Sequence, residues 1–197
     1  VFAPPMILPM LARGGREQAL AFLRDAPRET ARAFDVMAET LAEYARRCLA
    51  AGADGLFYAT NVAARGLMTA EECRRWQRPW DLRILEAVAD APFNLLHVCG
   101  AGIHFEEFAD YPVTALSFAL APGNPTLAQA HARTGRAVVG GLPAKPEIAG
   151  AGEAALLARA AAARREMQDR WHLLGPDCSI NPDTPELLLH AVRHATI

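Results

Sequence analysis

Short apolar runs alternate with longer amphipathic stretches along most of the chain. From Arg28 to Ala51 the apolar residues recur three and four positions apart, which predicts one long helix with a buried stripe. Leu56 to Thr60 and Phe93 to Val98 are instead short runs of strand type. Further strands are expected near Phe2, Val113, Ala137 and Trp171, and further helices over residues 16–25, 69–76, 80–89, 103–110, 126–133, 153–170 and 185–194.

Two local signals refine this pattern near the N-terminal half. Val1 to Met10 is apolar but rich in proline, which allows the beginning or the edge of a strand and not its centre. Thr69 followed by Glu72 forms a capping box, which marks the start of a helix that we expect to run through Trp76.

Alternating strands and helices predict an α/β fold with right-handed crossovers and a parallel sheet. No Gly-x-Gly-x-x-Gly or Walker-type loop follows a predicted strand, so a (β/α)8 TIM-type barrel is favoured over a nucleotide-binding open sheet. Only six strands are predicted where such a barrel needs eight, and we therefore expect its N-terminal strands to precede Val1. Because the two edges would expose backbone, preceding residues or a second copy in a homo-oligomer should cover them.

Composition restricts the class of protein without naming it. With 197 residues, about half of them apolar, residues 1–197 are expected to form a single barrel domain. A net charge of -2 with dispersed cations excludes nucleic acid as an expected partner. No run approaches the roughly 18 to 20 apolar residues of a membrane span, so we expect a cytoplasmic protein without a membrane partner.

The strongest chemical signal lies where the strand at Phe93 to Val98 ends. Residues two apart in a strand share a face, so His97 and Cys99 should place an imidazole and a thiol side by side. Cys178, which lies in a second strand-to-loop context, would be a third ligand for zinc and would leave one position open for chemistry. A buried histidine beside a cysteine also occurs in ordinary cores, and Cys48 and Cys73 are expected to be core packing.

Six segments, in this order and spacing, resemble the uroporphyrinogen decarboxylase superfamily, and within it the zinc-dependent methyltransferases that include methylcobamide:coenzyme M methyltransferase. They are Ala50–Phe57, Leu96–Gly100, Ala115–Ser117, Gly123–Leu127, Val138–Leu142 and Pro176–Pro185. The resemblance implies the C-terminal portion of a TIM-type barrel. The decarboxylases place a histidine where this chain has Cys178, whereas the methyltransferases place a zinc-binding cysteine there.

This resemblance implies a function for the predicted ligands. Zinc held by His97, Cys99 and Cys178 would activate a small-molecule thiol, which would then take a methyl group from a methyl-corrinoid carried by a corrinoid protein. Asp54 and Asn124 are candidate substrate contacts, and Ser117 is expected to face the same pocket without an assigned role. For the fourth zinc ligand the local acids are Glu106, Glu107 and Asp177, although each is expected to be a solvated surface charge. His104 is expected to be a surface or cap residue.

Two other functions stay open at this point. One is a decarboxylase-like enzyme that acts on a tetrapyrrole without metal, with Arg13, Arg16 and Arg65 as the available cations for the substrate carboxylates. The other is a non-catalytic barrel that holds a corrinoid or a partner protein at its mouth.

Overall fold

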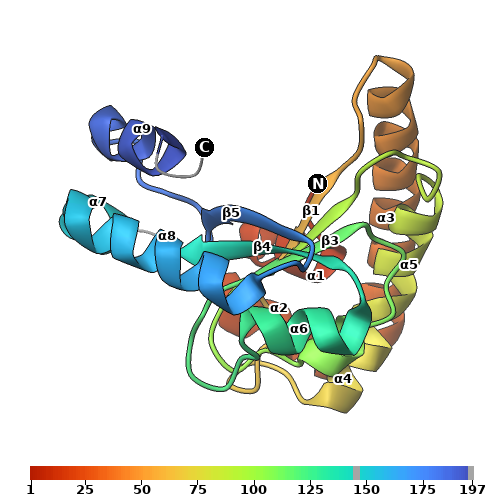
Figure 1. The fold of residues 1–197 in the computed structure, drawn as a ribbon. Helices are drawn as coiled ribbons and strands as arrows, with labels where there is room; N and C mark the ends of the chain where they lie inside the picture. Colours follow the sequence, from red (N-terminus) through yellow and green to blue (C-terminus); the bar gives the residue numbers. More distant parts are fainter. Residues whose placement is uncertain (144–146, 195–197) are drawn as a thin grey trace.

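The computed structural model describes residues 1–143 and 147–194 of the chain (Figure 1). Within them, five parallel strands form one sheet in the order of the chain: β1 (Phe57–Thr60), β2 (Leu95–Val98), β3 (Ala115–Phe118), β4 (Ala137–Leu142) and β5 (His172–Pro176). The helices are α1 (Pro4–Leu11), α2 (Gly15–Asp25), α3 (Pro27–Ala50), α4 (Ala70–Trp76), α5 (Arg78–Glu86), α6 (Leu127–Thr134), α7 (Glu147–Gly150), α8 (Glu153–Met167) and α9 (Glu186–His194), with a 3-10 turn η1 (Phe105–Phe108).

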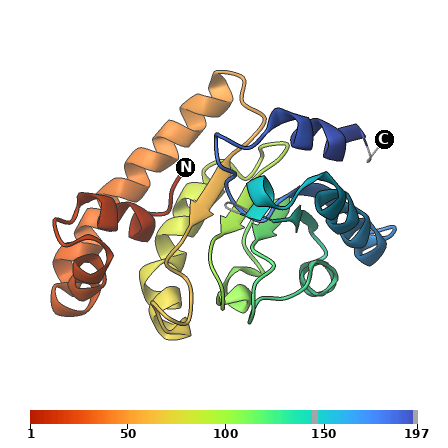
Figure 2. The ribbon, with the colours of Figure 1, turned by 90° about the vertical axis from the view of Figure 1, so that its left-hand side faces the viewer.

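Helical segments connect each strand to the next, and Figure 2 shows α2 and α3 beyond the β1 end of the sheet and α8 beyond its β5 end. A doubly wound sheet reverses its strand order at a switch point, whereas this sheet keeps the order of the chain throughout. The predicted α/β class is therefore confirmed, and the strands form a section of a (β/α)8 TIM-type barrel.

The two faces of the sheet differ in what covers them. Side chains such as Tyr58, Leu96 and Leu116 are fully buried and belong to the main hydrophobic core. The alternate positions, among them Ala59 and His97, line a cavity on the other face. This alternation follows from the two-residue period of a strand, and it places His97 on the face that the barrel encloses.

The prediction of a strand near Phe2 is wrong. Phe2 forms only a single parallel bridge with Ala59, and the chain enters α1 at Pro4. Pro4 and Pro5 occupy the first turn of that helix, where the missing backbone N–H costs nothing because no helical acceptor is available for it. Within the described residues the sheet thus has five strands, and the segment predicted to form a sixth is mostly helical.

Other predicted elements agree with the structure to within a few residues. The Thr69–Glu72 capping box is present: the backbone N–H of Glu72 donates to the Thr69 hydroxyl, and the backbone N–H of Thr69 donates to the Glu72 carboxylate. The predicted helix over residues 103–110 is only the 3-10 turn η1. Among the described helices none is both long and apolar enough to cross a membrane.

A buried polar cluster lies on the helix-covered side of β1. The hydroxyl of Tyr58 donates to Oδ1 of Asp81 at 2.6 Å, and the hydroxyl of Tyr111 donates to Oδ2 at 3.1 Å. Asp81 is fully buried, and burial raises its pKa to about 7. Cys73 is also buried, as predicted for a packing residue, and burial raises the pKa of its thiol to about 12.

Candidate metal centre

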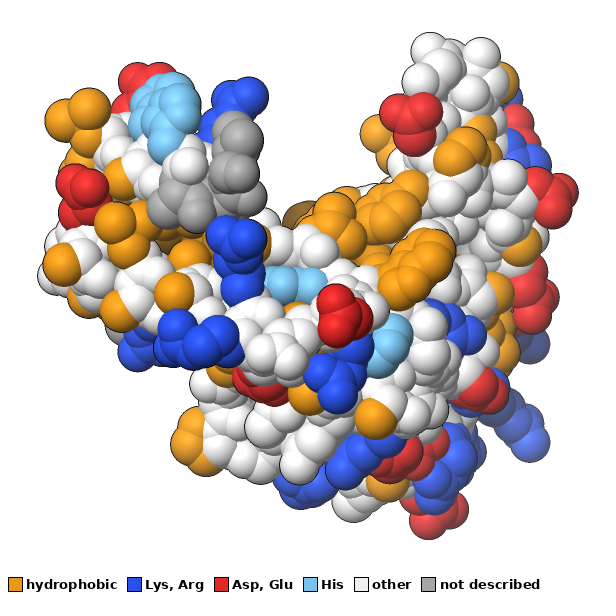
Figure 3. Space-filling view, viewed as in Figure 1, with side chains coloured by type: hydrophobic (Ala, Val, Ile, Leu, Met, Phe, Trp, Pro, Cys, Tyr) orange, Lys and Arg blue, Asp and Glu red, His pale blue; other side chains and the backbone are white. Residues whose placement is uncertain are grey.

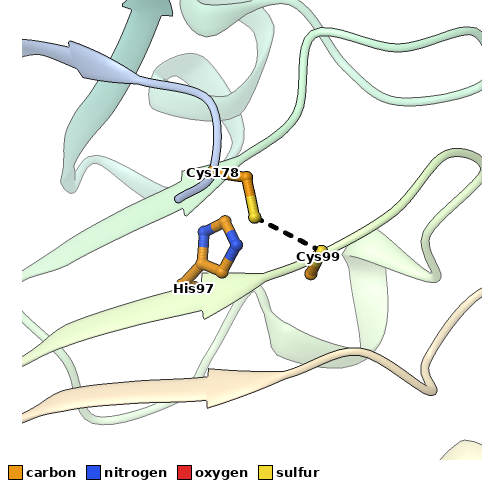
Figure 4. Close-up of side chains that lie close together, drawn as sticks. All are labelled: His97, Cys99 and Cys178. Atoms are coloured by element: carbon orange, nitrogen blue, oxygen red, sulfur yellow. Dashed lines mark hydrogen bonds between the residues drawn. The ribbon is translucent and has the colours of Figure 1, made fainter. Parts of the chain in front are cut away.

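The sheet brings together the three soft side chains that the sequence singled out. His97 lies near the carboxyl end of β2, Cys99 directly follows that strand, and Cys178 follows β5 (Figure 4). One ligand atom from each lies within 4.8 Å of the other two. The sulfurs of Cys99 and Cys178 are 3.5 Å apart although the residues are 79 positions apart in the chain. Parallel strands end at a common rim, which is why distant segments supply neighbouring ligands.

Neighbouring strands orient the imidazole of His97. His97 pairs in register with Ser117 on β3, and its Nδ1 lies 3.1 Å from the Ser117 hydroxyl. The ring also stacks against Phe57 with a centroid distance of 5.8 Å. Sequence reasoning noted Ser117 without a role; its place beside His97 depends on strand register, which the sequence pattern does not reveal.

The other ring nitrogen of His97 is the unusual feature of the site. Nε2 is buried and has no hydrogen-bond partner among the described residues. An unsatisfied buried polar atom costs about 1–3 kcal/mol, so it marks a position where a ligand would gain binding energy. Burial lowers the pKa of His97, which favours the neutral imidazole that binds metals.

The donor set fits zinc. Two sulfurs that each lie about 2.3 Å from a tetrahedral zinc ion would be about 3.8 Å apart, close to the separation of the two thiols in this structure. One imidazole and two thiolates are ligands that zinc accepts, and three protein ligands leave a coordination position for a substrate.

Asp177 is neither a surface charge nor placed as a fourth ligand. Its side chain is 8% exposed, so the expectation of a solvated surface acid is wrong. Its Oδ2 accepts from the backbone N–H of Leu120 at 3.0 Å, and its Oδ1 accepts from that of Gly141 at 3.2 Å. Burial raises the pKa of Asp177 while these two bonds act in the opposite direction.

The structure does not bring the two predicted substrate contacts into this group. Asp54 is exposed and precedes β1, at the opposite end of the sheet from the ligands. Asn124 connects loops: its amide nitrogen donates to the carbonyls of Gly100 and Ala119, both at 2.8 Å, and its oxygen accepts from the Ile103 N–H at 2.9 Å. Its polar atoms are thus engaged within the protein, and Asn124 shapes the rim rather than the cavity.

The remaining candidates near the rim also have local partners. Glu106 forms an ion pair with Arg133 at 2.7 Å, and Glu107 forms one with Arg74. His104 occupies the N-cap position of η1 but makes no side-chain capping bond; it is half-buried, and its Nε2 donates to the Met68 carbonyl at 2.7 Å. None of these three belongs to the described group of soft ligands.

A cavity of about 670 Å³ opens in front of the three ligands. Apart from the ligands its described lining is mainly apolar and includes Phe57, Leu95 and Ile180. Figure 3 shows hydrophobic side chains gathered in the hollow between the arm of α8 and α9 and the side of α3. The cavity can therefore accommodate a small organic molecule beside the three candidate ligands.

Comparisons with known proteins identify the family and the fold of this chain. A sequence model described as uroporphyrinogen decarboxylase (URO-D) matches residues 1–196. The chain belongs to the uroporphyrinogen decarboxylase family. Among solved structures, a methyltransferase from Methanosarcina mazei is similar with a TM-score of 0.78 and 20% sequence identity.

That structural match concerns the fold alone, given its low identity. It covers 98% of this chain and 56% of the methyltransferase, so this chain spans little more than half the length of that relative. No curated protein matches the chain. The family model and the structural match establish the family and the fold of this chain. Members of this family are enzymes.

Proposed function

We propose that this member of the uroporphyrinogen decarboxylase family is a zinc-dependent methyltransferase that moves a methyl group from a methyl-corrinoid to a thiol. The observation that carries the proposal is the convergence of His97, Cys99 and Cys178, with a buried ring nitrogen of His97 that has no partner among the described residues.

Each part of the site has a task in this reaction. His97, Cys99 and Cys178 would hold zinc, and Ser117 fixes the ring so that Nε2 is the nitrogen available to it. Bound zinc would lower the pKa of a substrate thiol, so that its sulfur is a thiolate at neutral pH. The apolar cavity would exclude water and hold the carbon chain of that thiol. Transfer would form a bond from this sulfur to the methyl carbon, and the electrons of the methyl–cobalt bond would stay with cobalt.

Metal binding tests the proposal directly. We expect the protein to bind one zinc ion, and His97→Ala, Cys99→Ala and Cys178→Ala each to lower zinc affinity by about a hundredfold or more. Cys48→Ala is the matched control, because Cys48 is a half-buried cysteine outside the group. Zinc retained undiminished by all three variants would refute the proposal.

Turnover separates the proposed function from the other two. The zinc-loaded protein should transfer the methyl group of methylcobalamin to a thiol, and the three variants should not. Zinc binding without transfer to any tested thiol would point to a non-catalytic corrinoid-binding barrel.

The tetrapyrrole decarboxylase has less support in the described part of the chain. Arg13 and Arg16 are exposed on the N-terminal helical segment, and Arg65 borders a separate pocket of about 320 Å³. None of the three lines the cavity beside His97. Tight binding of an acidic tetrapyrrole by the metal-free protein would reverse this ranking.

A further inference from the structure

Cys178 lies outside the sheet, and its neighbour Asp177 holds that segment in place. The backbone N–H of Asp177 donates to the Leu142 carbonyl at 2.8 Å, which continues the pairing of β5 with β4. Its carboxylate accepts from Leu120, just beyond β3, and from Gly141 on β4. One residue thereby connects the ends of three strands immediately before the cysteine.

Two glycines on β4 lie beside this carboxylate, and the surrounding side chains leave little space for a Cβ at either. A Cβ on Gly140 would lie 3.1 Å from Leu127 and 3.6 Å from Oδ1 of Asp177. Gly141 has a φ of +107°, a conformation that side chains rarely adopt, and a Cβ there would lie 2.5 Å from Ala163. Gly141, whose N–H donates to Asp177, thus keeps a backbone conformation and a packing against Ala163 that a side chain would disturb.

We infer that Asp177 is a positioning residue that holds the Cys178 thiol against Cys99. The contacts of Asp177 are independent of metal, whereas the benefit of holding the two thiols together rests on the proposed zinc site. Both carboxylate oxygens accept backbone hydrogen bonds, so the side chain orients the segment that carries Cys178. Cys99 needs no such device, because its backbone N–H is bound to the Thr60 carbonyl at 2.8 Å, in continuation of the β1–β2 pairing.

In the metal-free protein, the rate of disulfide formation between Cys99 and Cys178 reports how closely Cys178 is held to Cys99. Oxidised glutathione would serve as the oxidant: two protein thiols become one disulfide, and two molecules of glutathione are released. Peptide mapping without reduction gives the rate at which Cys99 and Cys178 become linked. Because their sulfurs are 3.5 Å apart, we expect this link to form faster than any other among the four cysteines.

Substitution of Asp177 should slow that reaction. With about a fivefold effect for each hydrogen bond, Asp177→Ala should slow linkage of Cys99 to Cys178 by more than tenfold. Asp177→Asn keeps one acceptor and turns an N–H toward the other backbone donor, so its rate should lie between those of the alanine variant and the native protein. Asp183→Ala is the matched control, since Asp183 is an exposed acid in the same segment, and it should react at the native rate.

A second readout reports on the metal site itself. In the cobalt-substituted protein, the thiolate-to-cobalt absorption should weaken in Asp177→Ala at a cobalt concentration that saturates the native protein, and Asp177→Asn should restore it in part. If Asp177→Ala does not fold, Asp177→Asn carries the test by both readouts. Native linkage rates in the Asp177→Asn variant would overturn the inference.

The two proposals fail in different ways. Rapid linkage in the native protein that slows in the Asp177 variants supports the positioning role even if zinc does not bind. Zinc binding that depends on His97 and the two cysteines, together with linkage rates insensitive to Asp177, supports the metal site and overturns the positioning role.

Discussion

Two buried polar groups on opposite faces of the same sheet differ in how completely they are satisfied. On the helix-covered face, each carboxylate oxygen of Asp81 accepts a tyrosine hydroxyl. On the cavity face, His97 has Ser117 beside one ring nitrogen, while the other nitrogen has no partner among the described residues.

This difference distinguishes a buried group that supports the fold from one that could bind a ligand. A buried polar group whose hydrogen bonds are all made within the protein stabilises or specifies the fold. One that lacks a hydrogen-bond partner lowers stability until a ligand binds it. Burial raises the pKa of Asp81, but both of its carboxylate oxygens already accept hydrogen bonds from tyrosine hydroxyls. A raised pKa by itself therefore does not distinguish a group that supports the fold from one that could bind a ligand.

The comparison predicts its largest effect at Asp81. Asp81→Ala leaves the Tyr58 and Tyr111 hydroxyls buried without their partner, and we expect a loss of about 3–5 kcal/mol in the free energy of unfolding. Urea denaturation at pH 7 measures it. Asp110→Ala is the control, because Asp110 is an exposed acid paired with Arg78 and should cost less than about 1 kcal/mol. Equal effects of the two substitutions would show that the buried carboxylate contributes no more to stability than an exposed one.

A somewhat smaller effect is expected from pH. The pKa of Asp81 is raised to about 7 in the folded protein, above the value of about 3.9 for an unfolded aspartate. Between these values the native state binds more protons than the unfolded state, so the stability that Asp81 contributes is fully present below about pH 4 and is lost as pH rises through about 7. Relative to Asp81→Asn, native stability should fall by about 2–3 kcal/mol between pH 5 and pH 8 in denaturation experiments. A difference that does not vary with pH would contradict the raised pKa.

Ser117 offers a test on the cavity face. Ser117→Ala removes the hydroxyl beside Nδ1 of His97, and zinc affinity should fall by about tenfold because the ring loses its orienting contact. Competition with a chromophoric chelator measures the affinity. Ser117→Thr keeps a hydroxyl at that position and should recover most of it. Unchanged affinity in Ser117→Ala would show that Phe57 and the strand alone orient the ring.

The smallest effect should come from the histidine itself when metal is absent. His97→Leu removes a buried nitrogen without a described partner together with the contact to Ser117, so we expect the free energy of unfolding in chelator to change by no more than about 1 kcal/mol. Added zinc should stabilise the native protein and not the variant. A loss above about 2 kcal/mol in chelator would mean that His97 contributes to the fold as Asp81 does.

Local patterns along the chain were sufficient for most of the elements. The three-and-four spacing of apolar residues predicts α3, and the Thr69–Glu72 pair predicts the start of α4. They failed at Pro4 and Pro5, because a missing N–H is compatible both with a strand edge and with the first turn of a helix. Only the packing of the following residues distinguishes the two.

The candidate ligands show the same division. The His-x-Cys pair could be placed on one face from strand period alone, and Cys178 was predicted as the third ligand from its strand-to-loop context before the resemblance to the family supported it. The partners of these residues could not be found in this way. Ser117 and Asp177 take their roles from strand register and from backbone N–H groups that adjacent sequence does not identify.

The sequence by itself determined the alternation of strands and helices and the three side chains suited to a soft metal, because periodicity and ligand chemistry are properties of individual segments. Only the tertiary structure decided that Asp177 is buried, that Asn124 joins loops, and that Asp54 lies at the far end of the sheet. Those properties depend on which strand ends meet at the rim, and parallel pairing brings together residues that are far apart in the chain.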